Sequence, residues 1–352
     1  MKIGIVTVQD SNNFGSFLQA YALQHVLQEM GHEVVFIRSR SRDYIKRIFY
    51  RVRPSRRELL HFLAYVSENW RGRKKYRKFQ KELKCFRVID QYKDEPLDLV
   101  ILGSDEIWNV NTAVFRLPIF YGEGMAPVMA YAVSIGDAEI EEMSCIPEKL
   151  FHRIQPILSR DKHTADFLRS IGIESPVVCD PTFLVNKSIF LRSYHHRLLK
   201  GQPFILIYSY GLEQNIVDSI CAFARQHHLR ILSACFSFEW CDGTFDCAAL
   251  DFCTVLEQAA YVFTSTFHGT IFSILNHKQF VSLPVSRKTE DLLESLELDK
   301  QVVYSQQCTV STLNEKLILQ TIDYDVIDTN IQQKREYSLQ LLREGIERNA
   351  IC

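Results

Sequence analysis

The chain has 352 residues, of which 47% are hydrophobic and 24% charged, a composition typical of a globular protein rather than a disordered one. This length exceeds that of one ordinary compact core and suits two domains. No apolar run approaches the ~20 residues that a membrane-spanning helix needs. The first eight residues are too short and too strand-like for a secretory signal. We therefore expect a cytoplasmic protein.

Positive charge is concentrated in one segment, although the net charge is only −1. Residues 38–87 contain 18 Lys and Arg against 4 Asp and Glu (net +14), and the rest of the chain has 23 against 38 (net −15). Such a segment suits an anionic membrane surface, which would hold the protein peripherally on the inner face of the plasma membrane. A solvated pair of surface helices is the alternative. We do not expect nucleic acid there, because its aromatic residues recur at helical spacing, which favours helix packing over base stacking.

The ten cysteines include no CxxC pair. Four of them, Cys235, Cys241, Cys247 and Cys253, recur every six residues, a spacing that matches no zinc-ligand pattern. We interpret the cysteines as reduced thiols and expect no metal.

The first part of the chain predicts the opening of a doubly wound sheet. Residues 2–8 form an apolar β-branched run typical of a buried parallel strand, residues 16–30 show helical periodicity, and residues 33–38 predict a second strand. Further strands are expected at 97–102 and 128–134. Helices are expected near 147–158 and at 162–171.

A second domain is predicted beyond residues 186–202, which lose clear periodicity and suit a linker. After them, alternation of strands and helices restarts. We therefore predict an α/β protein with two doubly wound Rossmann-like domains and an active site in the cleft between them. The predicted units are residues 1–190 with a basic helical insertion at 38–87, residues 200–325, and a helix within 326–352 that packs back onto the first domain.

Polar clusters follow several predicted strands, and ligands of open α/β sheets bind beyond the carboxyl ends of the strands. In residues 12–16, Gly15 permits close backbone approach, and the following helix offers free N–H groups to an anion; a turn with a helix cap is the alternative. In residues 103–109, Asp105 and Glu106 form a carboxylate pair that suits proton transfer or binding of sugar hydroxyls. An aspartate that caps a short helix is the alternative there.

Two further clusters carry basic side chains. Arg160 follows an apolar run and could form a bidentate pair with a carboxylate or phosphate, or simply pair with Asp161 at the surface. In residues 264–269 an apolar strand leads directly into a helix, and His268 lies near the helix N-terminus, where the dipole favours an anion. A histidine that only satisfies the core or caps the helix is the alternative.

Taken together, these clusters resemble the polysaccharide pyruvyl transferase family. The matching strings are NNFGSFLQAYAL (12–23), GSDEIWN (103–109), AYAVSIG (130–136), SRDKHTADFLRSIGI (159–173), VVCDPTFLV (177–185), TSTFHGTIFSILNHKQFV (264–281) and SRKTEDLLESLEL (286–298). The resemblance implies a GT-B-like fold and transfer of a carboxyethylidene group from phosphoenolpyruvate to a sugar, which forms a cyclic ketal. The implied acceptor belongs to a cell-surface polysaccharide or its lipid-linked precursor. No metal or organic cofactor is implied, and phosphoenolpyruvate is a co-substrate.

The resemblance also implies roles for individual residues. Arg160 and Arg287 would hold the donor. His268 would bind the donor phosphate or transfer a proton, and Asp105 would orient or deprotonate the acceptor hydroxyl. The remaining candidates are Ser265 and the amide of Gly269 for the donor's anion pocket, and Asn13, Gly15 and Glu106 for the acceptor. Relatives often carry aspartate where this chain has Ser265, so proton transfer would depend on His268 or Asp105.

Two other functions remain open at this point. A GT-B glycosyltransferase that uses a nucleotide sugar would share the fold, with Glu290 and Asp291 as candidate ribose ligands. A non-catalytic scaffold in polysaccharide assembly, held at the membrane by residues 38–87, is the second alternative.

Overall fold

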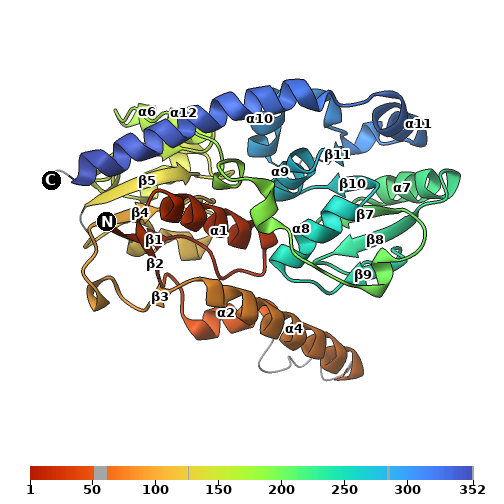
Figure 1. The fold of residues 1–352 in the computed structure, drawn as a ribbon, viewed down its shortest axis with the longest axis horizontal. Coiled ribbons are helices and arrows are strands. Elements are labelled where there is room, and N and C mark those ends of the chain that lie inside the picture. Colours follow the sequence, from red (N-terminus) through yellow and green to blue (C-terminus); the bar gives the residue numbers. More distant parts are fainter. Residues whose placement is uncertain (51–61, 126, 284–285, 351–352) are drawn as a thin grey trace.

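Two parallel β-sheets, each flanked by helices, form the two halves of the computed structural model, which describes residues 1–50, 62–125, 127–283 and 286–350 (Figure 1). The first sheet has the order β3-β2-β1-β4-β5-β6 and the second the order β11-β10-β7-β8-β9. The first comprises β1 (Lys2–Val6), β2 (Glu33–Ile37), β3 (Val88–Ile89), β4 (Leu99–Leu102), β5 (Val128–Val133) and β6 (Ile157–Ser159). The second comprises β7 (Phe204–Tyr208), β8 (Arg230–Ala234), β9 (Gly243–Phe245), β10 (Tyr261–Thr264) and β11 (Gln279–Ser282).

Both sheets are wound in the same way. In each, the first strand lies at the centre, the next two strands extend to one side, and the chain then crosses over to the other side. All strand pairs within the two sheets are parallel. This is the doubly wound order whose switch point, between the first and fourth strands, binds ligands beyond the carboxyl ends. The predicted fold class is confirmed, and the switch points lie after β1 and β4 and after β7 and β10.

Helices cover the two sheets and connect their strands. They are α1 (Phe14–Glu29), α2 (Arg42–Phe49), α4 (Phe62–Glu82), α5 (Lys149–His152), α6 (Lys162–Ser170), α7 (Gln214–Gln226), α8 (Ala249–Gln258), α9 (Phe267–Leu275), α10 (Arg287–Ser295), α11 (Val310–Asn314) and α12 (Tyr324–Ala350). The helix expected near 147–158 is wrong in its second half, because α5 ends early and β6 follows. Pro156 explains this difference, since proline in a helix interior removes a hydrogen bond and clashes with the preceding turn.

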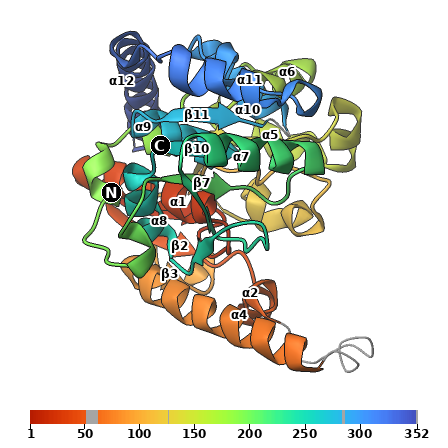
Figure 2. The same cartoon turned by 90° about the vertical axis from the view of Figure 1, so that its right-hand side faces the viewer.

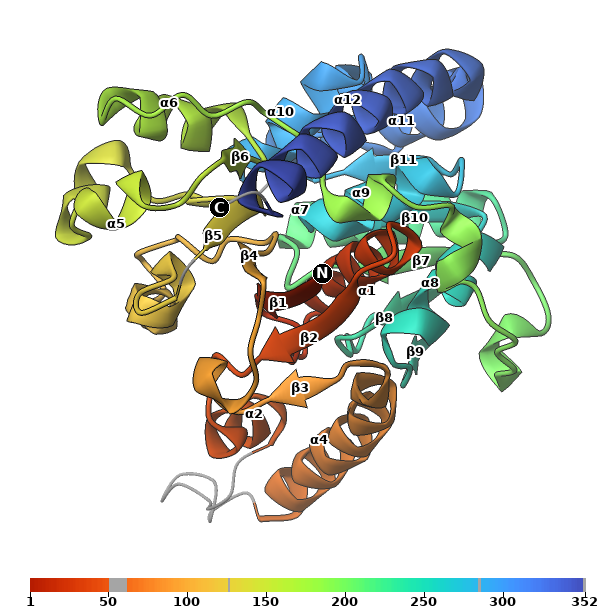
Figure 3. The same cartoon turned by 60° about the vertical axis from the view of Figure 1, so that its left-hand side comes forward.

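Helix α1 lies where the two halves meet and packs against α8 and α9 (Figure 3). Phe14, in its first turn, stacks on Tyr208 with ring centroids 5.9 Å apart and contacts Phe252 at 5.2 Å. Asn13 caps the helix, because its side chain accepts a hydrogen bond from the Gly15 amide. The loop after β1 is thereby held against the second sheet.

Helix α12 crosses from the second half of the molecule to the first (Figure 1). Near its start, Tyr324 donates a hydrogen bond to the Lys278 carbonyl (2.6 Å), and near its end Asn349 donates to the Gln155 carbonyl (2.9 Å). Between them, Ser338 accepts a hydrogen bond from the Cys179 amide (3.0 Å). The helix therefore ties the two sheets together. The exact domain limits predicted from the sequence remain predictions.

The described part of the basic segment 38–87 is helical, with α2 and α4 on the side of the molecule opposite α12 (Figure 2). The lysines of α4 do not form a uniform solvent face. Lys74 and Lys78 pair with Asp246 of the second half at 2.8 and 3.4 Å. Glu82, at the end of the helix, accepts hydrogen bonds from the first amides of α8. Helix α4 is thus a second connection between the halves.

None of the described helices is both long and apolar enough to cross a bilayer.

Candidate functional site

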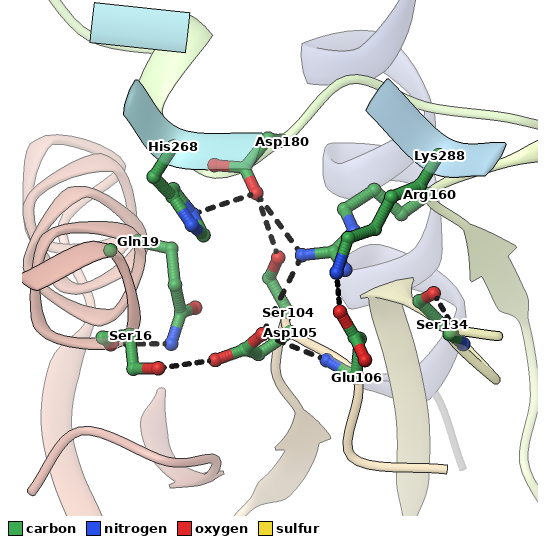
Figure 4. Close-up of polar contacts among 12 residues, drawn as sticks. Ser16, Gln19, Ser104, Asp105, Glu106, Ser134, Arg160, Asp180, His268 and Lys288 are labelled. Carbon is green, nitrogen blue, oxygen red and sulfur yellow. Dashed lines mark hydrogen bonds and ion pairs between the residues drawn. The ribbon is translucent and has the colours of Figure 1, made fainter. Parts of the chain in front are cut away.

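A cavity of about 590 Å³ lies between the two switch points, and Figure 4 shows polar residues of this region, among them Asp105, Arg160 and His268. The loop after β1 contributes Asn13, the first turn of α1 contributes Ser16, and the loop after β4 contributes Asp105 and Glu106. Arg160 follows β6. The second half contributes Ser265 and His268 after β10 and Lys288 from the start of α10. Most of the cavity's polar side chains therefore lie beyond the carboxyl ends of strands, where ligands of open α/β sheets bind (the strand-end rule).

Asp105 is held in a defined position at the end of β4. Its backbone has φ of 92°, a left-handed conformation that non-glycine residues adopt rarely and that the surrounding structure must enforce. One carboxylate oxygen accepts a hydrogen bond from the Ser16 hydroxyl (2.6 Å), and the other accepts one from the Glu106 amide (2.9 Å). These bonds fix the carboxylate at the cavity wall.

Arg160 is a buried arginine whose side chain is 2% exposed. One of its terminal nitrogens lies 3.5 Å from the Asp180 carboxylate and 3.8 Å from that of Asp105. Neither separation is a hydrogen bond, and all three guanidinium nitrogens are buried without a hydrogen-bond partner among the described residues. Because buried donors are normally satisfied, this guanidinium has capacity for an anionic ligand.

His268 lies in the first turn of α9, and its Nε2 is 3.5 Å from the Asp180 carboxylate. Its ring packs directly on Gly15 of α1: a Cβ added at Gly15 would lie 2.1 Å from the ring nitrogen Nδ1. Burial by itself would raise the pKa of Asp180, but the charges of His268 and Arg160 outweigh burial and hold this pKa well below its usual range. Asp180 therefore stays ionised between the two basic side chains.

Lys288 is the third basic side chain of this group. Its ammonium pairs with the Glu106 carboxylate and lies 5.7 Å from the centre of the Phe267 ring, while the Arg160 guanidinium lies 4.7 Å from the same ring. Burial lowers the pKa of Lys288 to about 8, although the nearby negative charge of Asp105 acts to raise it. The Phe267 ring thus contacts two cations at one wall of the cavity.

The structure brings together most of the residues predicted from the sequence. Their placement is as follows: Asn13, Asp105, Glu106, Arg160, Ser265 and His268 line the cavity, while Gly15 underlies His268 instead of the cavity. The Gly269 amide donates to the Thr266 hydroxyl that caps α9, so it is already occupied. Arg287 does not join the group, because its side chain is 60% exposed and pairs with Glu139 at 3.3 Å. Ser265 shares a hydrogen bond with Ser209 (2.7 Å).

Sequence reasoning gave no role to Lys288 or Asp180. Asp180 follows the short apolar run at 177–179, so the strand-end rule could have selected it. Lys288 is adjacent to Arg287, and no sequence signal distinguishes which of the two side chains faces the cavity. The arrangement as a whole can bind a small ligand with two anionic groups and can place a carboxylate beside it.

Comparison with known proteins identifies a family for the chain and relatives of its fold. The family model "Polysaccharide pyruvyl transferase" matches residues 13–287 of the chain. No curated protein sequence matches it. Among solved structures, the chain is similar to a putative UDP-N-acetylglucosamine 2-epimerase from Listeria monocytogenes, with a TM-score of 0.59, 12% identity and coverage of 98% of this chain and 95% of the other. It is also similar to UDP-GlcNAc 2-epimerase from Neisseria meningitidis bound to UDP-GlcNAc, with a TM-score of 0.54, 12% identity and coverage of 99% and 100%. These likenesses confirm the predicted GT-B-type fold.

Proposed function

Since the chain belongs to the polysaccharide pyruvyl transferase family, we propose that it transfers a carboxyethylidene group from phosphoenolpyruvate to two hydroxyls of one sugar. The proposed acceptor is a sugar of a cell-surface polysaccharide or of its lipid-linked precursor. The observation that carries this proposal is the convergence of Arg160, His268 and Lys288 on one cavity. The Arg160 guanidinium is buried there and makes no hydrogen bond with any residue that the structure describes. Phosphoenolpyruvate carries a phosphate and a carboxylate on neighbouring atoms, so it needs several cations at close range.

In the proposed reaction, the methylene carbon of phosphoenolpyruvate takes a proton and becomes a methyl group, which makes C2 electrophilic. One sugar hydroxyl attacks C2, phosphate leaves, and the second hydroxyl closes the ketal ring. In the net reaction, one of the two hydroxyl protons ends in the new methyl group and the other leaves with phosphate. The chain's own task is to hold the donor, supply the first proton and accept one from the sugar.

We assign donor binding to Arg160 and Lys288 and proton donation to His268. The Arg160 fork suits a bidentate contact with the donor's carboxylate or phosphate. Lys288 acts as a compact positive charge. Asp180 is a positioning residue in this scheme, because it lies between Arg160 and His268 and is nearly inaccessible.

We assign the acceptor side to the first half of the molecule. Asp105 is the proposed base, since its carboxylate lines the cavity and is 16% exposed. Ser16 fixes its orientation through the 2.6 Å hydrogen bond. Glu106, which pairs with Lys288, lies between the donor and acceptor groups.

A lipid-linked acceptor would place the reaction at the inner face of the membrane. The proposed contact is the exposed face of α4 around Trp70. Trp70 is 64% exposed there, and Arg73, Arg77 and Lys81 are also exposed. Tryptophan and basic side chains are the residues that favour an anionic membrane interface.

The test is release of phosphate from phosphoenolpyruvate in the presence of a panel of lipid-linked and nucleotide-linked sugars. We expect release only with a suitable acceptor, together with a product whose mass increases by one carboxyethylidene group. His268→Gln should lower both signals by about 10²- to 10⁴-fold. His277→Gln, at an exposed histidine that pairs with Asp328, is the matched control. Binding of a nucleotide sugar without any response to phosphoenolpyruvate would contradict the proposal and favour glycosyl transfer.

A further inference from the structure

The cavity extends beyond the residues assigned so far, towards the end of β2. Its lining also includes Arg40, Tyr44, Ile48, Val114 and Phe115. Because β2 is separated from β4 by β1, the end of β2 lies two strand spacings, roughly 10 Å, from the end of the strand that carries Asp105. Arg160 follows β6, two strands further away on the opposite side of β4. The Arg40 region is therefore the end of the cavity remote from the proposed donor site.

Arg40 is built into this wall as a rigid group. Its side chain is 4% exposed, and one terminal nitrogen pairs with the buried carboxylate of Asp10. The guanidinium carbon lies 5.9 Å from the centre of the Tyr44 ring. Its Nε is buried and has no hydrogen-bond partner among the described residues. A buried donor in this state carries a free-energy cost that a ligand acceptor would remove.

The chemistry of this end favours an anion. Arginine has only donors, and its planar fork matches carboxylate and phosphate geometry. Tyr44 and Phe115 supply ring faces that suit the apolar faces of sugars. The Asp105 carboxylate lines the cavity at the end of β4, so a negative group beside it would be repelled. The charge pattern therefore permits an anionic group at Arg40 and disfavours it beside Asp105.

We propose that Arg40 is a specificity residue that binds an anionic group of the acceptor, a phosphate or a carboxylate, about one or two sugar rings from the hydroxyls that receive the pyruvyl group. This inference rests on the proposed function for the orientation of the acceptor. Asp10 holds the guanidinium in place. The acceptor's anionic group accepts a hydrogen bond from Arg40 Nε, which has no partner among the described residues. A neutral glycan lacks this contact.

The experiment uses the full chain. For each sugar of the panel, three acceptors are compared: its neutral alkyl glycoside, its glycosyl diphosphate, and the same sugar linked to a uronic acid. We expect the wild type to have a KM roughly 10- to 100-fold lower for at least one anionic acceptor than for the neutral one. Arg40→Gln should abolish that preference while leaving the KM for phosphoenolpyruvate unchanged, and Arg40→Lys should restore part of it. The diphosphate and uronic acid arms identify the source of the anion.

Matched controls separate this role from a structural ion pair. The double variant Asp10→Asn/Arg40→Gln removes both charges and leaves no unpaired buried carboxylate. Arg38→Gln removes a neighbouring arginine that pairs with Asp90 and does not line the cavity, so it should keep the preference. Equal KM values for neutral and anionic acceptors in the wild type, or a preference that survives in Arg40→Gln and in the double variant, would overturn the inference.

Direct binding keeps the two proposals distinguishable. If the wild type releases no phosphate from phosphoenolpyruvate with any acceptor, the proposed function fails. Calorimetric titration with the glycosyl diphosphate and with the uronic acid glycoside, without any donor, then tests Arg40 alone. We expect binding of at least one anionic glycoside to wild type and to Arg38→Gln, weakened roughly 10- to 100-fold in Arg40→Gln. Unchanged binding in Arg40→Gln would overturn the Arg40 subsite.

Discussion

Two regions of the molecule are rich in basic side chains, and they differ in how those charges are satisfied. On α4, Lys74 and Lys78 are partly exposed and pair with Asp246 at 2.8 and 3.4 Å. In the cavity, Arg160 is buried, lies 3.5 Å or more from its nearest carboxylates, and has no hydrogen-bond partner among the described residues. Exposed ion pairs contribute little, whereas a buried cation whose donors make no hydrogen bond costs free energy unless a ligand completes it. Burial and missing hydrogen bonds, rather than charge density, therefore mark the candidate site.

The largest expected effect is on proton transfer. His268→Gln should lower kcat by about 10²- to 10⁴-fold, because a positioned general acid contributes about that much. Steady-state rates of acceptor-dependent phosphate release measure it, and a His268→Gln enzyme with normal kcat would remove this histidine from catalysis.

Gly15→Ala should have the next largest effect. The new Cβ would lie 2.3 Å from the ring carbon Cγ of His268, so the ring must move. A misplacement of about 1 Å can cost about 10²-fold in rate. The same kinetic assay, with thermal unfolding to verify that the fold is retained, measures it. A variant with unchanged kcat would show that the ring position is not critical.

The two arginines at the donor side should differ. Arg160→Gln should raise the KM for phosphoenolpyruvate roughly 10- to 100-fold, since loss of a charged hydrogen-bond partner is costly. Arg287→Gln should change it less than about 5-fold, because its exposed pair with Glu139 lies outside the cavity. This expectation revises the equal roles implied by the family resemblance. Similar effects of both substitutions would restore Arg287 to the donor site.

Lys288 should make donor binding depend on pH. Its pKa is lowered to about 8 by burial, so the side chain is charged below pH 8 and becomes neutral as the pH rises through that value. We therefore expect kcat/KM for phosphoenolpyruvate to fall on the alkaline side of pH 8. Lys288→Arg should extend the active range upward, because arginine remains charged. An identical alkaline limb in both enzymes would exclude Lys288 as its cause.

The smallest effect is expected on α4. Lys74→Ala with Lys78→Ala should lower the free energy of unfolding by no more than about 1 kcal/mol, the range of exposed ion pairs, and should leave kinetics unchanged.

Charge reversal of the exposed Arg77 and Lys81 should instead weaken sedimentation with anionic vesicles. Unchanged vesicle binding would return that face of α4 to a solvated surface.

Much of the fold could be predicted from the sequence, because most of the buried parallel strands are short apolar runs and most of the longer helices show helical periodicity. The short strand β9 was not predicted, since Gly243–Phe245 has no apolar run of its own and depends on pairing with β8. The second half of the helix predicted near 147–158 was wrong because Pro156 outweighs the apolar periodicity there.

Part of the candidate site could also be predicted, because Asp105, Arg160 and His268 follow strands that end at the same edge. Lys288 could not be chosen over Arg287, since adjacent helical residues point about 100° apart and the helix start sets which one faces inward. The occupied amide of Gly269 follows from Thr266 as helix cap, a pattern that the sequence does contain.

The central claim is that the buried cations of the cavity, and not the lysines of α4, hold phosphoenolpyruvate. Calorimetric titration of phosphoenolpyruvate into the acceptor-free protein tests it most directly. The account predicts binding to the wild type and to the Lys74→Ala/Lys78→Ala variant, and binding weakened roughly 10- to 100-fold in Arg160→Gln and in Lys288→Gln. Equal binding to the wild type and both cavity variants would contradict it.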